Sequence, residues 1–490
     1  MDQTTVVRRA APIDEDDDAS NEPMAVIPSV ATASASSSAP AAGSSSSGSA
    51  AGGKSLFSRK PNSAAVSIHS SDPGLEFDQL MRIYYSRLFP FKKYYRWLSY
   101  GNVQKHYFCN REFSFTLEGD IYVRYQSFST EEQLRKEIIQ RNPIKIDIGA
   151  VYNVEPKDHK QVRGPEFKAE EKEVVFDIDM TDYDDIRTCC KGADICFRCW
   201  PFMTIAVRIL DRALRDDFGF KSLLWIYSGR RGVHCWVCDN SVRTYDSNIR
   251  TVLTDYLSVV KGSEKNAKKV ALTNPLHPSL QKSLDIIEEY WEPVILGDQD
   301  ILRSPAHIDR VLATIPDEDN ARMRQALRNE WNTHPNGTSQ ERWKQLVQEV
   351  YLSVKAGKSY LKSTVPEIMF QFAYPRLDVE VTKGVNHLLK SPFCVHPKTG
   401  RVCVPMDVDS IDDFDPFAVP TIQELCSQIN QFDAANPHAT TDSGKKLQDY
   451  KKTKLKDFMS PFLKFLEPLE SNIRDAKLMD MDKDGMAMDW

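Results

Sequence analysis

The chain lacks any long apolar segment. No run among its 490 residues approaches the roughly 20 apolar positions that a membrane-spanning helix needs, and the N-terminus has no apolar core of the signal-peptide kind. These absences predict an intracellular protein with no membrane partner, in a compartment that keeps thiols reduced. The ten cysteines therefore need an explanation other than disulfides.

The chain also lacks an excess of positive charge. Its formal net charge of −6 does not by itself indicate nucleic-acid binding, although a local basic cleft can coexist with acidic surfaces elsewhere. Hydrophobic residues make up 41% and charged residues 27%, as in ordinary soluble globular proteins. The length suffices for about two to four domains, and no internal repeat is found.

Composition divides the chain into five segments. Residues 1–73 are predicted to be disordered, because an acidic run and an Ala/Ser/Gly-rich stretch cannot bury enough apolar surface to offset the entropy of ordering. We expect the first part of a core over 74–243 and a polar helical insertion over 244–367. The second part of the core, with C-terminal helices, is expected over 368–470, and a flexible acidic tail over 471–490.

The periodicity predicts a mixed α/β fold. Apolar positions at helical spacing indicate helices over 80–98 and 202–218. Alternation around a Gly-Asp turn predicts a hairpin over 112–125, and two apolar runs around a glycine-rich turn predict strand, turn and strand over 223–237. Residues 377–381 also alternate in the manner of a strand.

One strand-like run ends in two carboxylates. In Glu173-Val-Val-Phe-Asp-Ile-Asp179, the side chains of Asp177 and Asp179 are two positions apart and would point to the same face of a strand. Divalent cations of the hard type prefer such oxygen ligands, and a metal pair can stabilise both oxygens of a phosphoryl transfer. Alone, the same pattern is more often a solvated surface feature.

A glycine-rich turn lies between the two later strands. Ser228-Gly-Arg-Arg-Gly-Val-His234 combines a hydroxyl, two guanidinium groups and an imidazole with glycines that let a turn approach a ligand closely. Arginine binds phosphate oxygens through its planar fork, so the turn suits a polyphosphate. A tight hairpin with two surface arginines is the alternative.

A third group of residues follows much later in the chain. Asp378 lies in the strand-like run and could complete a metal site with Asp177 and Asp179, while Lys390 and His396 would add positive charge near a triphosphate. Three carboxylates with a basic phosphate-binding group form a self-consistent nucleotidyltransferase site. Taken alone, Lys390 would more often be a solvent-exposed lysine.

Four cysteines crowd into one short stretch. Cys189, Cys190, Cys196 and Cys199 could supply the four sulfur ligands of a structural zinc site. An alternative set would join the Cys196 and Cys199 pair to Cys235 and Cys238. The compact set is preferred, because the latter two lie in a strand-like run where positions three apart face opposite sides.

These motifs, in this order, resemble the catalytic small subunits of eukaryotic DNA primases, in the archaeo-eukaryotic primase family. The resemblance runs from about residue 78 to about residue 421. It rests on several stretches: Arg111-Glu-Phe-Ser-Phe-Thr-Leu, Val174-Val-Phe-Asp-Ile-Asp-Met-Thr-Asp-Tyr-Asp, Arg187-Thr-Cys-Cys, Tyr227-Ser-Gly-Arg-Arg-Gly-Val-His-Cys-Trp-Val-Cys-Asp, Tyr374-Pro-Arg-Leu-Asp, Asn386-His-Leu-Leu-Lys-Ser-Pro-Phe and Val395-His-Pro-Lys-Thr-Gly-Arg.

The resemblance implies the fold and the roles of residues. It implies a mixed α+β primase catalytic core with a small zinc module and a helical insertion. Asp177, Asp179 and Asp378 match the metal triad, for magnesium or manganese. The matches to triphosphate contacts are Ser228, Arg230, Arg231, His234, Lys390 and His396. Asp147 matches a contact to the ribose hydroxyl, while Glu112, Tyr122 and Arg124 match residues near the incoming nucleotide. The four clustered cysteines match zinc ligands.

The function implied by the resemblance is synthesis of short RNA primers from ribonucleoside triphosphates on a single-stranded DNA template. It also implies a heterodimer with a primase large subunit, association with DNA polymerase alpha and a nuclear location. Two rival functions stay open. One is a primase-polymerase that uses deoxynucleotides in repair or damage tolerance, and the other is a non-catalytic, nucleic-acid-binding scaffold subunit.

Overall fold

Two antiparallel sheets carry most of the expected site residues. In the computed structural model, residues 75–102, 106–262, 266–316, 320–437 and 447–486 are described, and Phe77 onward belongs to one unit. The first sheet has the order β2-β1-β3-β4. The short strand β8 also pairs with β3, at Asp147 and Ile148. Its strands are β1 (Arg111–Leu117), β2 (Ile121–Gln126), β3 (Lys145–Tyr152), β4 (Ala169–Glu171) and β8 (Leu389–Lys390). The predicted disorder of residues 1–73 falls outside the described residues.

The predicted hairpin is the β1–β2 pair. Phe115 pairs with Val123 and Leu117 with Ile121. The turn needs positive φ, which Gly119 (76°) and Asp120 (58°) both adopt. These residue types tolerate the left-handed region, which explains why the chain reverses here.

The second sheet has the order β5-β7-β6, with β5 (Val174–Ile178), β6 (Leu223–Tyr227) and β7 (Val233–Val237). The predicted strand-turn-strand is confirmed as β6 and β7. Every residue of these strands is buried except Asp177, which is partly exposed. An apolar sheet that exposes one carboxylate predicts a functional rather than a structural role for that residue.

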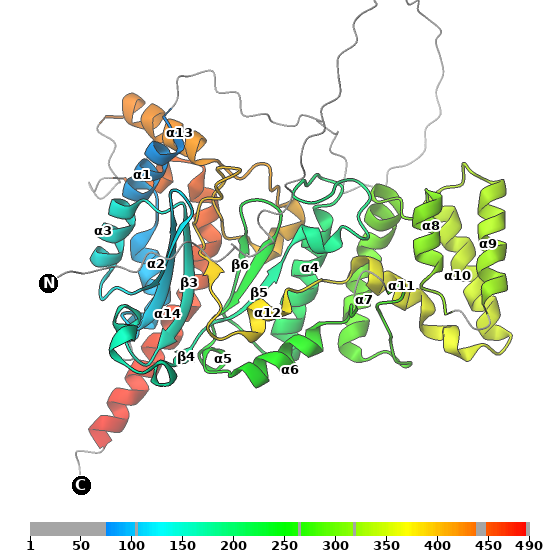
Figure 1. Cartoon of the computed structure of the whole chain (residues 1–490), viewed down its shortest axis with the longest axis horizontal. Helices are drawn as coiled ribbons and strands as arrows, with labels where there is room; N and C mark the ends of the chain where they lie inside the picture. Colours follow the sequence, from blue (N-terminus) through cyan, green and yellow to red (C-terminus); the bar gives the residue numbers. More distant parts are fainter. Residues whose placement is uncertain (1–74, 103–105, 263–265, 317–319, 438–446, 487–490) are drawn as a thin grey trace, which may run out of the picture. The chain divides into compact units, whose positions relative to one another are not determined.

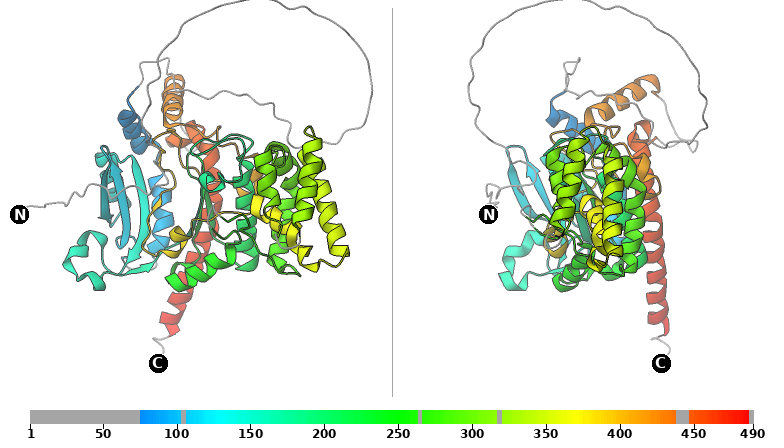
Figure 2. Two further views of the ribbon diagram at one scale, coloured as in Figure 1. Left: turned by 45° about the vertical axis from the view of Figure 1, so that its right-hand side comes forward. Right: turned by 90° about the vertical axis from the view of Figure 1, so that its right-hand side faces the viewer.

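Helices account for most of the remaining chain. Figures 1 and 2 show that α7 to α10 lie on the opposite side of the second sheet from the first sheet. The helices are α1 (Phe77–Arg87), α2 (Phe91–Leu98), α3 (Glu131–Arg141), α4 (Pro201–Arg212), α5 (Asn240–Arg243), α6 (Ser247–Leu257), α7 (Pro278–Tyr290), α8 (Pro305–Leu312), α9 (Ala321–Thr333), α10 (Ser339–Lys355), α11 (Thr364–Ala373), α12 (Val379–Lys383), α13 (Ile422–Ala435) and α14 (Leu455–Met486). Within the described residues, no helix is both long enough and apolar enough to cross a membrane.

Three predicted helical regions have the expected character. Residues 80–98 fall in α1 and α2, and residues 202–218 fall in α4 and a π-helical turn over Ala213–Asp217. Gly219 ends that helix with φ of 74°, as a C-terminal glycine often does. The chain between 247 and 373 is helical wherever the structure assigns regular elements.

The strand predicted over residues 377–381 is wrong. Asp378 instead caps the short helix α12, and its Oδ1 accepts a hydrogen bond from the Glu380 backbone N–H at 3.1 Å. The alternating valines suggested a strand, but a carboxylate that can cap a helix competes with that pattern. The Thr382 hydroxyl then ties α12 to the Val175 carbonyl at 2.7 Å.

The C-terminal segment over 471–490, for which we expect a flexible tail, lies partly within the last helix. Helix α14 continues to Met486, and residues 487–490 lie outside the described part. Its first half packs on the core, where the Phe462 ring lies 6.1 Å from Trp97 and 5.1 Å from Phe393. A helix anchored in this way can extend through the helix-forming Ala, Leu, Met and Lys residues that follow.

Candidate active site

Asp177 and Asp179 stand at the end of β5, the edge strand of the second sheet. Each side chain is 27% exposed, in contrast to the buried strand around them. Asp179 caps a short turn, and its Oδ1 accepts hydrogen bonds from the Thr181 backbone (2.8 Å) and hydroxyl (2.7 Å). The end of the strand therefore presents two partly exposed carboxylates, and hydrogen bonds hold that of Asp179 in place.

Asp378 reaches the same place from the far end of the sequence. Its backbone N–H donates to the Asp177 carbonyl at 3.1 Å. That carbonyl and the Val175 carbonyl lie on the free edge of β5, where α12 packs. The structure thus brings Asp378 to the other two aspartates, through backbone contacts that the sequence could not predict.

Carboxylates crowd one another in this site. Burial, together with Asp179 and Asp378, raises the pKa of Asp177 well above its ordinary value, and Lys390 opposes this effect. Such a set of oxygen donors fits a divalent cation, which would offset the repulsion among them. The aspartates do not form as tight a donor set as the cysteines described below.

The glycine-rich turn between β6 and β7 is held against the aspartates. The Ser228 hydroxyl accepts a hydrogen bond from the Gly232 N–H at 3.0 Å and closes the turn. A Cβ atom on Gly232 would lie 2.6 Å from the Ile178 carbonyl oxygen and 3.4 Å from the Asp179 Cα. Glycine at this position therefore lets the turn pack closely against the end of β5, next to Asp179.

Three basic residues of this turn and strand have different positions. Arg231 is buried, and its Nε lies 2.7 and 2.8 Å from the two carboxylate oxygens of Asp179. The His234 Nε2 lies 3.5 Å from the Asp177 Oδ1, across the β5–β7 pair. Arg230 is half-buried, and its carbonyl accepts from the Tyr227 hydroxyl at 2.9 Å.

His396 lies directly beside the same turn. A Cβ atom on Gly229 would come within 2.9 Å of the His396 Cβ, and Gly229 has φ of 90°. The Thr399 hydroxyl donates to the Gly229 carbonyl at 2.8 Å. Residues 396–399 therefore pack directly against the turn over 228–232.

Lys390 and Asp147 link the first sheet to this site. They are opposite each other in the β3–β8 pair, and Lys390 is close enough to influence the pKa of Asp177. The Ser114 hydroxyl lies 3.0 Å from the Asp147 Oδ2 and 3.1 Å from the Tyr122 hydroxyl. The buried Asp147 Oδ1 accepts no hydrogen bond from the described residues, and its neighbour is the Lys145 Nζ at 3.5 Å.

Glu112 and Arg124 form a pair on β1 and β2. The Arg124 Nε donates to the Glu112 Oε1 at 3.0 Å, and the Tyr152 hydroxyl donates to the Glu112 Oε2 at 3.2 Å. The Glu112 side chain is fully buried, whereas that of Arg124 is 34% exposed. Glu112 therefore orients Arg124, which is the member of the pair that a ligand could reach.

The compact cysteine set comes together as predicted. The sulfur atoms of Cys189, Cys190, Cys196 and Cys199 all lie within 4.8 Å of one another. Within the described part of the chain, they are the one group of three or more metal-type donors gathered this closely. Hydrogen bonds with Cys189 and Cys199 hold the pKa of Cys196 well below its ordinary value, whereas burial raises that of Cys190 and hydrogen bonds with Cys189 and Cys196 raise that of Cys199. Four sulfur donors gathered in this way suit a tetrahedral zinc ion.

The alternative cysteine set is not formed. Cys235 lies in the middle of β7, paired with Phe176 and Trp225, and it is fully buried. The Cys238 sulfur accepts a hydrogen bond from the Trp97 Nε1 at 3.4 Å. These two thiols serve the packing of the second sheet.

Comparison with known proteins identifies the family. Residues 176–408 match the family model described as DNA primase small subunit. The chain is 41% identical to the DNA primase small subunit of Drosophila melanogaster, over 86% of this chain and 98% of the fly protein. The chain belongs to the DNA primase small subunits.

Two fungal relatives agree. The DNA primase small subunit of Schizosaccharomyces pombe is 42% identical over 74% of this chain and 81% of its own length. That of Saccharomyces cerevisiae is 36% identical over 72% of this chain and 85% of its own length. The family expected from the motifs is confirmed, and so is the enzyme class, since primase small subunits are nucleotidyltransferases.

Two supporting residues of this site were not predicted from the sequence. Thr181 holds the Asp179 carboxylate, and Ser114 holds Asp147. Ser114 and Asp147 are opposite each other in the β1–β3 pair. Only the register of the two strands brings them together, so no local signal could have identified Ser114.

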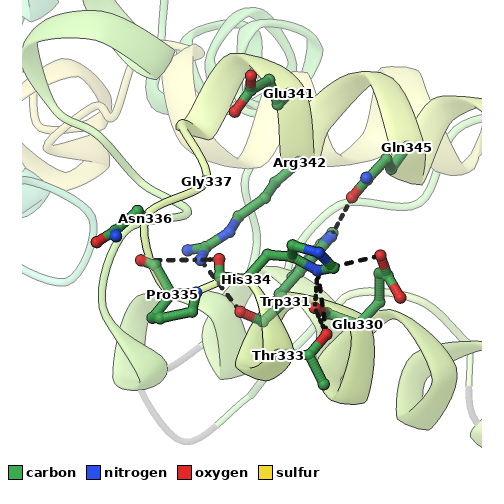
Figure 3. Close-up of a pocket in the computed structure, with 10 residues that line it drawn as sticks. All are labelled: Glu330, Trp331, Thr333, His334, Pro335, Asn336, Gly337, Glu341, Arg342 and Gln345. Carbon is green, nitrogen blue, oxygen red and sulfur yellow. Dashed lines mark hydrogen bonds and ion pairs between the residues drawn. The ribbon is translucent and has the colours of Figure 1, made fainter.

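A separate pocket of about 600 Å³ lies among the helices α9 and α10 (Figure 3). None of the predicted site residues lines it. Arg342 is almost fully buried and donates to the backbone carbonyls of Leu302 (2.6 Å) and His334 (2.9 Å). Trp331 donates to Gln345 at 2.7 Å. These contacts brace the loop between the two helices and do not form a reactive site.

Proposed function

We propose that this chain synthesises short RNA primers on single-stranded DNA, with Asp177, Asp179 and Asp378 as the ligands of catalytic magnesium or manganese ions. The observation that carries the proposal is the backbone hydrogen bond from Asp378 to Asp177, because it unites carboxylates from two distant parts of the chain. The glycine-rich turn packed against Asp179 places the basic residues beside them.

The residues around the aspartates suit an incoming triphosphate. Ser228, Arg230, His234, Lys390 and His396 supply donors and positive charge that offset the charge on the phosphates. Arg231, now paired with Asp179, could exchange that carboxylate for a phosphate oxygen when a cation occupies the site. Two bound divalent ions would lower the pKa of the primer 3′-hydroxyl and stabilise the leaving pyrophosphate.

Asp147 is proposed to select ribonucleotides. Its Oδ1 is buried and lacks a hydrogen-bond donor within the described residues, so it offers an acceptor for a ribose hydroxyl. The hydroxyl of Ser114 holds the other oxygen, and it also lies 3.1 Å from the Tyr122 hydroxyl. Burial and then Asp147 raise the pKa of Tyr122 to about 12, so this hydroxyl stays protonated.

The four clustered cysteines are proposed to bind one structural zinc ion. Four thiolate ligands leave no open position for a reacting group. The cluster directly precedes α4, which begins at Pro201 and packs inside the core. Zinc would therefore stabilise the start of that helix and would not take part in the chemistry.

The activity is tested with the full-length chain, single-stranded DNA, manganese or magnesium, and either ribonucleotides or deoxynucleotides. We expect short RNA products from the intact chain and none from an Asp177→Ala, Asp179→Ala variant. Products restricted to deoxynucleotides would instead indicate a primase-polymerase of the repair type. An absence of product, even with a primase large subunit added, would leave the scaffold function.

Ribonucleotide selection is tested with Asp147→Asn. A hydrogen bond to a charged group contributes about 1.5–3 kcal/mol, so the preference for ribonucleotides over deoxynucleotides should fall about 10- to 100-fold. Asp120→Asn makes the same chemical change at the exposed hairpin turn and should leave the preference unchanged. An unchanged preference in Asp147→Asn would remove Asp147 from this role.

Family membership also supports the proposed partners. These are a primase large subunit, with which the chain would form a heterodimer, and the DNA polymerase alpha complex. A nuclear location is proposed on the same basis, because primer synthesis for replication takes place where the chromosomal template is. Copurification of the full-length chain with the large subunit tests the first partner directly.

A further inference from the structure

A groove of about 410 Å³ lies beside the segment that carries Asp378. Its walls come from the end of α6, the chain that follows it and the segment that includes α12 (both helices are labelled in Figure 1). Leu377 and Val379, the two neighbours of Asp378, both line the groove. The groove therefore lies next to the backbone of Asp378, although none of the three aspartates lines it.

The topology of the second sheet places the groove opposite the triphosphate site. Strand β7 and the turn over 228–232 occupy one edge of β5. On the other edge, the Val175 and Asp177 carbonyls accept hydrogen bonds from Thr382 and Asp378. The two candidate ligand surfaces thus approach the aspartates from opposite edges of the same strand.

The groove carries more cationic than acidic side chains. Lys261, Lys269, Arg376 and Lys383 line it, whereas its acidic residues are Asp182 and Asp255. Two of the cations are fixed: the Lys269 Nζ lies 2.6 Å from the Asp185 Oδ2, and Arg376 binds the other oxygen of Asp185.

The other two cations can respond to a ligand. Lys261 is exposed, and its backbone N–H donates to the Lys269 carbonyl at 2.8 Å, which fixes the base of its side chain. Lys383 is 29% exposed and lies 3.6 Å from the carboxylate of Glu380, a residue that is itself largely exposed. Such loose contacts hold lysines at a surface without neutralising them.

We propose that this groove binds the phosphodiester backbone of the growing primer, with Lys261 and Lys383 contacting its phosphates. The inference rests on the proposed function. In phosphoryl transfer the attacking and leaving oxygens are roughly in line, on opposite sides of the transferred phosphorus. With the pyrophosphate on the side of the glycine-rich turn, the 3′-hydroxyl enters from the side of Asp378, where the groove lies.

The test uses full-length protein and extension of an RNA primer annealed to a DNA template. We compare wild type with the double variant Lys261→Ala, Lys383→Ala, and with Lys261→Arg, Lys383→Arg, which retains both charges. Lys344→Ala removes an exposed lysine on α10 that is outside the groove and serves as the matched control.

The alanine variant should raise KM for the primed template about tenfold or more and leave KM for the ribonucleotide within about twofold. Each lost phosphate contact makes the negative slope of log(kcat/KM) against log[salt] shallower by about 0.7–0.9, so two lost contacts make it shallower by about 1.4–1.8. The arginine variant should recover most of both effects. An unchanged template KM and salt slope would overturn the proposal, as would a rise confined to the ribonucleotide KM.

Neutral methylphosphonate linkages identify the strand. Placed near the 3′ end of the primer, they should reduce the difference between wild type and the alanine variant, whereas the same linkages in the template should not. The reverse result would overturn the assignment to the primer and indicate that the groove binds the template strand. If the wild-type protein itself made no RNA, the proposed function would be contradicted. This outcome is distinct from one in which the wild type is active and the lysines of the groove have no effect.

Discussion

Gly232 offers a sensitive test of how the glycine-rich turn supports the site. In the Gly232→Ala variant, the added Cβ would lie 2.6 Å from the Ile178 carbonyl oxygen. This oxygen belongs to the backbone of a buried strand, so it cannot move aside as the end of a side chain could. Either the turn or the end of β5 must shift, and Asp179 follows directly after Ile178.

The size of the effect follows from the contact. Forcing one extra carbon into a well-packed site costs about 1–3 kcal/mol, which lowers the midpoint of thermal unfolding by only about 1 °C for each kcal/mol in a folded unit of this size. A shift of about 1 Å in a reacting group can lower the rate about 100-fold. Activity should therefore fall much more than stability.

Gly164→Ala is the matched control. A Cβ atom there would meet nothing within 4 Å, and neither glycine has positive φ. Thermal unfolding and the kcat for primer extension are measured for both variants. If Gly232→Ala retained the stability and kcat of Gly164→Ala, the close packing of the turn on β5 would not be a requirement of the site.

Two further predictions concern groups outside the reacting centre. Burial raises the pKa of Glu173, but the charge and hydrogen bonds of Arg111 and the hydrogen bond from Tyr100 together outweigh it, so this pKa falls from 4.5 to about 2. The resulting stabilisation, about 3 kcal/mol at about 1.4 kcal/mol per pKa unit, should be present above pH 4.5 and be lost as the pH falls toward 2. Glu173→Gln should remove this acid dependence of the unfolding midpoint and cost about 3–5 kcal/mol at neutral pH. Cys196→Ser should release zinc, measured by metal analysis of the purified chain, whereas Cys426→Ser, outside the cluster, should retain it; equal zinc content in both would contradict the proposed site.

Several elements could be predicted from the sequence because their signals are local. The strands β5, β6 and β7 follow from short apolar runs with glycines between them, and the β1–β2 hairpin follows from alternation around Gly119 and Asp120. The compact cysteine set could also be predicted, since its members are close in sequence and strand geometry argued against the alternative.

Other parts of the site depend on contacts between distant segments. The alternation around Asp378 indicated a strand, but the capping carboxylate and the bond from Thr382 to β5 stabilise a helix there. The pairing of Asp147 with both Ser114 and Lys390 depends on the registers of β3 with β1 and β8. Such registers are set by packing across the whole sheet and cannot be read from either strand alone.

The most direct measurement is single-turnover extension of a labelled RNA primer by Asp378→Asn. Asparagine caps helices as well as aspartate does and can still accept from the Glu380 N–H, so α12 should stay folded. Asp246→Asn makes the same change at the cap of α6 and serves as the control. We predict that Asp378→Asn unfolds at the wild-type temperature but loses several kcal/mol of transition-state stabilisation, a fall of about 10²–10³-fold in rate. A rate within tenfold of the control would contradict the assignment of Asp378 to the catalytic metal site.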